Sequence, residues 1–138
     1  MTDIFTKQKR SEIMSKIRAK NTKPEMIVRH FLFSQGFRFR LHQKNLPGSP
    51  DIVLKKHKTV IIVNGCFWHG HNNCSIFKIP KTRVKFWTSK IERNKARDIS
   101  DKKALKKLGW KVIIVWECQL RKYKLEKTLN SIVNRISP

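Results

Sequence analysis

Two short apolar runs, Thr59–Val63 and Trp110–Trp116, constrain the fold of this chain more than any other feature. Both are rich in β-branched residues that follow one another without polar alternation, which is typical of strands buried on both faces of a sheet. Between them, from about Arg83 to Leu108, the apolar positions follow helical spacing, and Gly109 ends that pattern. The chain is therefore predicted to fold as an α/β protein.

The remaining segments add helices and strands around these two runs. A helix is predicted to begin at Asn21–Glu25, with Pro24 in its first turn, and to end at Gly36. Further expected elements are strands at Phe37–Leu41 and Asp51–Leu54, turns at Leu46–Pro50 and Lys55–Lys58, and a helix at Lys122–Ile136. The order α-β-β-β-α-β-α indicates a mixed central sheet flanked by helices. We expect one domain over residues 1–138, with residues 1–20 as a basic N-terminal helical arm.

The charge of the chain indicates a polyanionic partner. Lys and Arg number 32 against nine Asp and Glu, which gives a net charge of +23. The basic residues are spread along the chain, which favours nucleic acid over a membrane surface. No apolar run reaches the roughly 18 residues of a membrane span, and the first ten residues lack the apolar stretch of a signal peptide. Because three cysteines are an odd count, we expect no closed disulfide framework and a cytoplasmic location.

The acidic residues are few enough to consider one by one. Six are expected in solvated positions: Asp3 in the terminus, Glu12 in the basic first helix, and Glu92, Asp98, Asp101 and Glu126 in Lys-rich helices. Glu25, Asp51 and Glu117 remain, each at the edge of a regular element. These three are the candidates for a role in chemistry.

Asp51 follows Pro50 at the start of a strand, and a parallel apolar strand is expected about a dozen residues later. Many metal-dependent nucleases place a carboxylate there to hold Mg²⁺ against the scissile phosphate. The alternative is a turn aspartate that accepts hydrogen bonds from its own backbone. The common nuclease pattern also needs an acid and a lysine on the next strand, where this chain has Asn64 and Cys66. Another residue must then supply the proton chemistry.

The cysteines and two histidines gather around one irregular segment, Gly65–Pro80. Cys66, His71 and Cys74 lie within nine residues, and Cys118 follows the last strand. Three thiolates and one imidazole can form a tetrahedral structural zinc site; the alternative is three free buried cysteines. His69 is left over, either as a general base, a competing ligand or a surface histidine. We expect no role for His30, His42 and His57.

Two aromatic pairs lie in basic surroundings, Phe67-Trp68 and Phe86-Trp87. Aromatic residues are usually part of a core. Phe67 and Trp68, however, fall in a polar loop, where insertion between base pairs is an option, and Met14 on the basic arm could be a second wedge.

These motifs together resemble the very short patch repair (Vsr) endonucleases. The similar residues are Pro50-Asp51, the block Asn64-Gly65-Cys66-Phe67-Trp68-His69 with His71 and Cys74, Phe77–Pro80, Phe86-Trp87, Gly109-Trp110 and Trp116-Glu117-Cys118. The resemblance implies a restriction-endonuclease-like fold with a structural Zn²⁺. It also implies a Mg²⁺-dependent nick in double-stranded DNA beside the T of a T:G mismatch, such as deamination of 5-methylcytosine produces.

The resemblance also implies roles for single residues. Asp51 and the backbone carbonyl of Val63 would bind Mg²⁺, His69 would be the general base, and Glu25 would lie near the metal-bound water and the base. The zinc ligands would be Cys66, His71, Cys74 and Cys118. Phe67, Trp68 and Trp87 would wedge beside the mismatch, and Met14 would reach the minor groove. Asn64 departs from the family, which often has His or Asp there; an amide can orient water or phosphate but carries no charge or proton.

From the resemblance we expect a monomeric bacterial enzyme that is associated with the nucleoid when it acts. Its expected functional links are to a DNA cytosine methyltransferase and to mismatch-repair proteins. Two alternatives stay open. One is a restriction- or transposition-type nuclease of the same fold, and the other is a zinc-stabilised DNA-binding module without catalysis.

Overall fold

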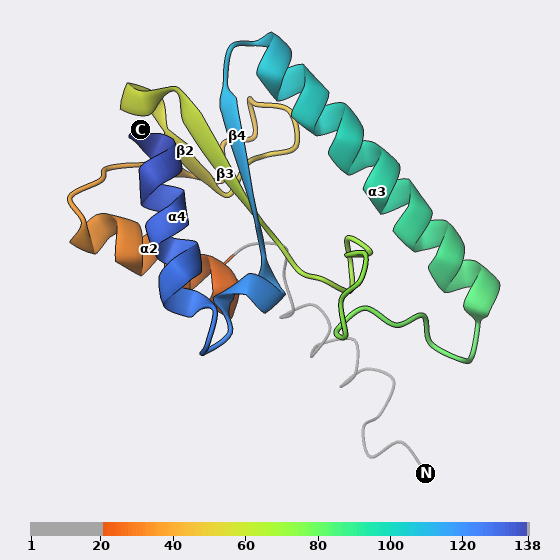
Figure 1. Ribbon diagram of the computed structural model, residues 1–138. Helices are drawn as coiled ribbons and strands as arrows, with labels where there is room; N and C mark the ends of the chain where they lie inside the picture. Colours follow the sequence, from red (N-terminus) through yellow and green to blue (C-terminus); the bar gives the residue numbers. More distant parts are fainter. Residues whose placement is uncertain (1–20, 138) are drawn as a thin grey trace, which may run out of the picture.

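The computed structural model describes residues 21–137, which form a four-stranded mixed sheet with helices on both faces (Figure 1). The strands, in spatial order, are β1 (Arg40–Leu41), β2 (Ile52–Leu54), β3 (Thr59–Asn64) and β4 (Lys111–Trp116). β1 pairs antiparallel with β2, β2 pairs antiparallel with β3, and β3 pairs parallel with β4. The predicted mixed α/β sheet is confirmed.

The helices divide between the two faces of the sheet. α2 (Lys23–Ser34) and α4 (Leu125–Ile136) lie side by side on one face, and α3 (Val84–Lys107) crosses the other (Figure 1). Two short 3₁₀ turns, η1 (Lys55–His57) and η2 (Glu117–Leu120), follow β2 and β4. α3 is the crossover between the parallel strands, as a parallel pair requires a connection long enough to return to the same edge.

Alternation along the strands builds two separate apolar layers. Ile52 and Leu54 of β2 and Ile61 of β3 pack in a cluster with α2 and α4. Val53 and Val60 point the other way and pack with Leu105 of α3. Because successive side chains of a strand point to opposite faces, both faces are apolar, which explains the continuous apolar runs in the sequence.

Three expectations about these elements need correction. The strand predicted at Phe37–Leu41 contains only Arg40–Leu41, and the last helix begins at Leu125 rather than Lys122. The strand that follows β2 is antiparallel to it, because the connection through η1 is too short for a parallel crossover. The predicted arm over residues 1–20, with Met14, lies outside the described residues. Within the described part of the chain, no helix is long and apolar enough to cross a membrane.

Candidate functional site

The parallel pair brings two distant chain segments to the same edge of the sheet. In the register of β3 and β4, Asn64 lies opposite Trp116, and both strands end there. Cys66 and Cys118 each follow two residues after these strand ends. Glu117 links the two exits, because its Oε1 accepts a hydrogen bond from the Cys66 backbone N–H at 3.1 Å. This is the carboxyl end of the strands, where open α/β sheets bind their ligands.

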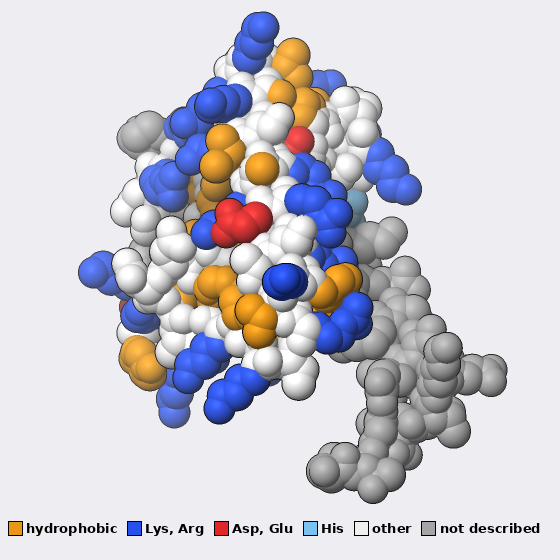
Figure 2. Space-filling model, turned by 90° about the vertical axis from the view of Figure 1, so that its right-hand side faces the viewer, with side chains coloured by type: hydrophobic (Ala, Val, Ile, Leu, Met, Phe, Trp, Pro, Cys, Tyr) orange, Lys and Arg blue, Asp and Glu red, His pale blue; other side chains and the backbone are white. Residues whose placement is uncertain are grey.

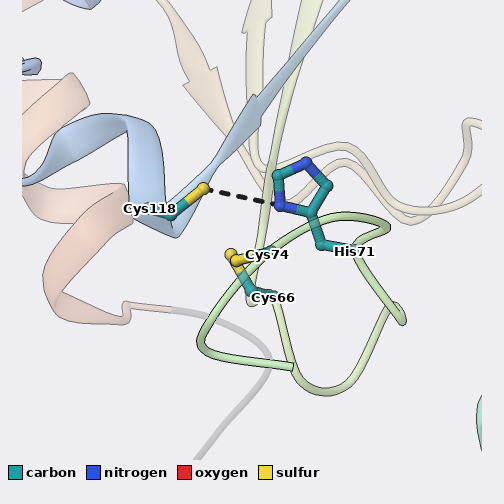
Figure 3. Close-up of side chains that lie close together, drawn as sticks. All are labelled: Cys66, His71, Cys74 and Cys118. Atoms are coloured by element: carbon teal, nitrogen blue, oxygen red, sulfur yellow. Dashed lines mark hydrogen bonds between the residues drawn. The ribbon is translucent and has the colours of Figure 1, made fainter. Parts of the chain in front are cut away.

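At this edge the four predicted zinc ligands converge (Figure 3). One ligand atom from each of Cys66, His71, Cys74 and Cys118 lies within 4.8 Å of all the others. Cys118 Sγ is 3.4 Å from His71 Nδ1. The imidazole of His71 stacks on the indole of Trp116, with ring centroids 4.0 Å apart and an angle of 6° between the planes. Trp116 therefore fixes the orientation of the imidazole.

The electrostatics of this cluster suit a bound cation. Burial raises the pKa of the Cys66 thiol to about 12, so on its own this thiol holds its proton at neutral pH. Burial, with a smaller contribution from Lys124, lowers the pKa of His71 and keeps the imidazole neutral. A neutral imidazole and thiols that lose their protons to a cation are the donors that a tetrahedral metal site uses. The Cys₃His cluster can therefore hold a metal ion.

A second cluster lies where α2 meets the start of β2. Glu25, in the first turn of α2, and Asp51, just before β2, are only 1% and 8% exposed. Asp51 Oδ2 accepts a hydrogen bond from the Val63 N–H at 2.7 Å. Glu25 Oε2 lies 2.8 Å from His42 Nε2, and ligand atoms of Glu25, His42 and Asp51 lie within 4.8 Å of one another. Two buried carboxylates at this separation could hold a hard cation.

The surroundings of Asp51 disfavour its negative charge. Burial raises the pKa of Asp51 to about 7, and the nearby carboxylate of Glu25 acts in the same direction. The Val63 N–H and His42 oppose this shift without cancelling it. A divalent cation beside Asp51 would offset both burial and repulsion, because it restores the favourable interaction that the charged form lacks.

A histidine–aspartate pair lines the same cleft as Asp51. His69 Nδ1 is 2.6 Å from Asp98 Oδ2, and the two residues are 29 positions apart. The cleft has a volume of about 500 Å³, and Asp51, Val63, Asn64, His69 and Asp98 all line it. Because a carboxylate can only accept hydrogen bonds, the imidazole donates its Nδ1–H to Asp98. The other ring nitrogen, Nε2, is then free to accept a proton. This arrangement suits a general base.

Three residues of this site contradict the sequence analysis. Asp98 and Asp101 were expected in solvated positions of a Lys-rich helix, but both line the cleft, and Asp98 also contacts His69. His42 was expected to have no role, but it contacts Glu25. Both contacts join residues far apart in the chain, so local spacing carries no signal for them. The only clue in the sequence is chemical. A histidine that acts as a general base is commonly oriented by a carboxylate, and Asp98 is one of the few carboxylates in this chain.

Comparison with known proteins places the chain in a family. The family model described as "DNA mismatch endonuclease Vsr" matches residues 2–75. The chain is 52% identical over 137 residues to the "Type II nicking enzyme V.NmeAIP" of Neisseria meningitidis, covering 99% of this chain and 97% of the relative. It is 45% identical over 121 residues to the "DNA mismatch endonuclease Vsr" of Escherichia coli, covering 88% and 77%. This chain belongs to the Vsr family.

As a Vsr-family DNA mismatch endonuclease, the protein acts on DNA, and the expected restriction-endonuclease-like architecture is confirmed. Its two clusters share one edge of the sheet. The catalytic candidates come from three separate segments. Asp51 directly precedes β2, Glu25 lies in α2, and His69 lies in the loop after β3. The structure brings Asp51 and His69 to one cleft. Glu117, the third acid singled out by elimination, supports the metal cluster through the Cys66 backbone.

The aromatic residues form a cluster beside the cleft. The ring centroid of Phe67 lies 5.1 Å from that of Trp68 and 5.4 Å from that of Trp87, and the two indoles are 5.8 Å apart. All three side chains are partly exposed. The backbone carbonyl of Trp68 accepts a hydrogen bond from Asn94 Nδ2 of α3 at 2.8 Å. The next residue along the chain is His69, so the aromatic loop and the histidine are held by the same helix.

Proposed function

We propose that this protein nicks one strand of double-stranded DNA beside the T of a T:G mismatch and so starts very short patch repair. The observation that carries the proposal is one cleft that is lined by both Asp51 and the hydrogen-bonded pair of His69 and Asp98. The Phe67-Trp68-Trp87 cluster adjoins it through the Trp68-His69 peptide. Such mismatches arise where 5-methylcytosine deaminates, so a functional link to a DNA cytosine methyltransferase is part of the proposal.

The residues of the cleft divide the work of phosphodiester hydrolysis. His69, oriented by Asp98, accepts a proton from the attacking water at Nε2. Asp51 and the Val63 carbonyl would bind the catalytic cation, and Glu25 would hold water beside it. Mg²⁺ at this position would supply charge stabilisation at the phosphate and the leaving oxygen. In this mechanism His69 carries out the proton transfer for which the common nuclease pattern uses a lysine.

The aromatic cluster supplies the preference for a mispair. Insertion of a ring between base pairs costs a few kcal/mol of unstacking, and that cost is lower at a weakly stacked mismatch. Phe67, Trp68 and Trp87 are the inserting rings. Selectivity for T:G then comes partly from the deformability of the duplex and not only from hydrogen bonds to the bases.

The Cys₃His cluster binds Zn²⁺ with a structural role. Four protein ligands from Cys and His fill a tetrahedral site, which leaves no open position for a substrate. The metal would fasten the loop after β3 to the end of β4. Because that loop also carries Phe67, Trp68 and His69, the zinc supports both recognition and catalysis indirectly.

A nicking assay tests this function. T:G, T:A and C:G duplexes of otherwise identical sequence are incubated with the zinc-loaded protein and with Mg²⁺ or excess EDTA. We expect a nick in the T strand of the T:G duplex alone, only with Mg²⁺, and none with Asp51→Ala, which should still bind DNA. Cleavage of both strands of the T:A duplex would identify a restriction-type nuclease instead. Binding without any nick would identify a non-catalytic module.

Trp68→Ala isolates the wedge. We expect this variant to keep its fold, its zinc and its sequence-independent DNA binding, but to lose the preference for T:G over T:A. Phe33→Ala is the matched control, because Phe33 is an exposed aromatic residue of α2 outside the cluster. An unchanged ratio of nicking rates in Trp68→Ala would assign Trp68 to core packing and contradict the proposed recognition.

A further inference from the structure

His42 joins the two halves of the acidic site. It follows β1 directly, and its backbone N–H donates to the Asp51 carbonyl at 3.1 Å. Its side chain extends in the other direction, where Nε2 lies 2.8 Å from Glu25 Oε2. One residue thus contacts the chain at Asp51 through its backbone and the carboxylate of Glu25 through its imidazole.

Two further hydrogen bonds of Glu25 come from its own side of the fold. Oε1 accepts the backbone N–H of Asn21 at 3.0 Å, and Oε2 accepts from Arg29 Nη1 at 3.2 Å. Asn21 precedes Thr22, the N-cap of α2, and Arg29 is one turn beyond Glu25 in the helix. These two contacts orient the carboxylate relative to α2 but not relative to the sheet. His42 supplies a hydrogen bond from the end of β1.

The backbone of His42 adopts an uncommon conformation. Its φ is +47°, in the left-handed region, which few residues with a β-carbon adopt, although His, Asn and Asp occur there more often than the others. Such strain persists where surrounding contacts determine the geometry, and it concentrates at functional sites. Here the strained residue lines the cleft and makes both contacts described above.

We propose that His42 is a positioning residue, which holds the Glu25 carboxylate at the distance from Asp51 at which both acids serve one divalent cation and its water. This inference deepens the proposed function and rests on it. Since a carboxylate can only accept, Nε2 of His42 donates to Glu25. Groups that orient metal ligands or their water in this way typically change metal affinity or activity 10–100-fold when they are removed.

Two substitutions separate the side-chain contact from the backbone conformation. Asparagine tolerates the left-handed region, but its amide reaches only as far as the Nδ1 position of histidine. Glutamine reaches the Nε2 position and can still donate to Glu25. We therefore compare His42→Asn with His42→Gln, and use His30→Asn, an exposed histidine of α2, as the matched control. Melting temperatures verify that each variant is folded.

The first measurement is Mn²⁺ affinity without DNA, by electron paramagnetic resonance of the zinc-loaded protein, with Asp51→Ala to identify the site. We expect His42→Asn to weaken Mn²⁺ binding by about tenfold or more, and His42→Gln and His30→Asn to stay within about threefold of wild type. The second measurement is nicking, in which kcat should fall in His42→Asn while KM for the duplex stays constant, with recovery in His42→Gln.

Three results would overturn the inference. The first is wild-type Mn²⁺ affinity in folded His42→Asn, and the second is an equal loss in His42→Asn and His42→Gln. The third is a directly coordinated ¹⁴N signal in wild-type Mn²⁺ spin-echo spectra that vanishes in His42→Gln, which would make His42 a ligand. Failure of the proposed function is distinguishable, because the Mn²⁺ measurements contain no DNA and do not depend on T:G preference.

Discussion

The surroundings of the Asp51 carboxyl group are unfavourable to its negative charge. It is 8% exposed, and its carboxylate has one backbone N–H donor, from Val63, and another carboxylate nearby. The result is a pKa of about 7 instead of 3.8. A buried group of this kind exchanges its proton for a metal ion, so the same environment that destabilises the free carboxylate creates the driving force for cation binding.

The raised pKa of Asp51 predicts a specific pH dependence of stability in the protein with its acidic site free of divalent cations. Between about pH 4 and pH 7 the unfolded chain has released the Asp51 proton and the native protein retains it. The native state then binds more protons, so the free energy of unfolding falls as the pH rises through this window. The loss is on the order of a few kcal/mol.

Urea unfolding of wild type and Asp51→Asn from pH 4 to pH 8, with no added divalent cations, measures this effect. We expect the stability difference to move in favour of Asp51→Asn as the pH rises, because the amide has no charge to bury. Other titrating groups contribute equally to both proteins. A difference that stays constant across the range would contradict the raised pKa.

Asp98 is predicted to act through His69. With Asp98→Asn, the amide can donate to Nδ1 and favour the tautomer that carries its proton on Nε2, which cannot accept a proton from water. We expect kcat for nicking to fall at least ~100-fold, in the range that a general base contributes. Asp101→Asn removes the same charge from the same cleft and the same helix, and should have a far smaller effect. Comparable losses in both variants would point to charge alone.

At the residue scale, the sequence identified groups by type and local spacing. Asp51, His69 and the four residues of the Cys₃His cluster were predicted as candidates because each stands at the end of an element or in an unusual segment. Asp98 and His42 were missed, because their partners are 29 and 17 positions away and their own neighbours suggest solvated roles. Lys102 follows Asp98 by four residues. This spacing occurs both for exposed aspartates and for aspartates that face a cleft, so it does not distinguish between them.

At the scale of elements, α3 supports the loop that is proposed to carry recognition and catalysis. Asn94 and Asp98, one turn apart, bind the Trp68 carbonyl and the His69 imidazole. Gly70 then packs directly on the helix, since a β-carbon there would lie 2.6 Å from Ile91 Cγ2. Residues 68–70 therefore contact a single stripe of α3, so a rigid element sets the distance between Trp68, the proposed wedge, and His69, the proposed base.

Gly70→Ala is predicted to disturb the packing of residues 68–70 against α3. The φ of Gly70 is +58°, and the added methyl group must displace Ile91, which is buried. We expect a loss of about 1–3 kcal/mol in the free energy of unfolding, as for overpacking of a core, and a loss of T:G nicking. Gly36→Ala is the matched control, because Gly36 has a φ of +90° with no atom within 4 Å of the added group.

Unfolding by urea and nicking of the T:G duplex are measured for both variants. The left-handed backbone penalises both alanines, so the excess effect in Gly70→Ala reports the contact with α3. If Gly36→Ala is as damaging as Gly70→Ala in both measurements, the close approach has no role.

The elements themselves were largely predictable, and their pairing was not. Periodicity and the stop residues Gly36 and Gly109 place α2, α3, β3 and β4 within a few residues of the prediction. β1 is shorter than the alternating segment Phe37–Leu41, because only Arg40 and Leu41 find partners on β2. The antiparallel direction of β2 relative to β3 follows from the short connection between them, which contains η1. The apolar sequence of β3 alone does not indicate this direction.

At the scale of the whole molecule, the parallel register of β3 and β4 decides where the metal cluster forms. It aligns Asn64 with Trp116, so residues 52 positions apart in the chain leave the sheet together. The sequence contained all four ligands, but only this register brings Cys118 to His71. The cluster therefore closes a large loop that includes α3, which predicts a large contribution of the metal to stability.

Removal of this metal is predicted to destabilise the fold. A strong chelator, or Cys118→Ser, leaves a loop between β3 and α3 without its fastening to the end of β4. We expect one zinc per chain in wild type by atomic absorption, and a lower melting temperature after chelation. Lys122→Ser is the control for a surface change nearby. A Cys118→Ser variant that keeps the wild-type melting temperature with no zinc would show that the cluster is not structural.

The distribution of charge over the molecule predicts how it binds DNA. The net charge is +23, and the face formed by α3 presents many Lys and Arg side chains and few acids (Figure 2). On this helix the acids Asp98 and Asp101 line the cleft, whereas the acid Glu92 is exposed together with the basic residues Arg93, Arg97 and Lys103. The exposed charges of α3 are therefore mostly positive, so this face of the molecule can meet phosphates.

Because phosphate contacts release condensed counterions, binding should weaken steeply with salt. If roughly six phosphates are neutralised, affinity falls about a thousandfold between 50 and 200 mM salt. T:G and T:A duplexes should show the same slope of log K against log salt, since phosphates carry no sequence information, while their affinities differ by a constant factor. Fluorescence anisotropy with Ca²⁺, to avoid cleavage, measures both slopes. A shallow slope for T:A would place the basic surface outside the DNA contact, and a steeper slope for T:G would mean that the mismatch recruits additional phosphates rather than ring insertion alone.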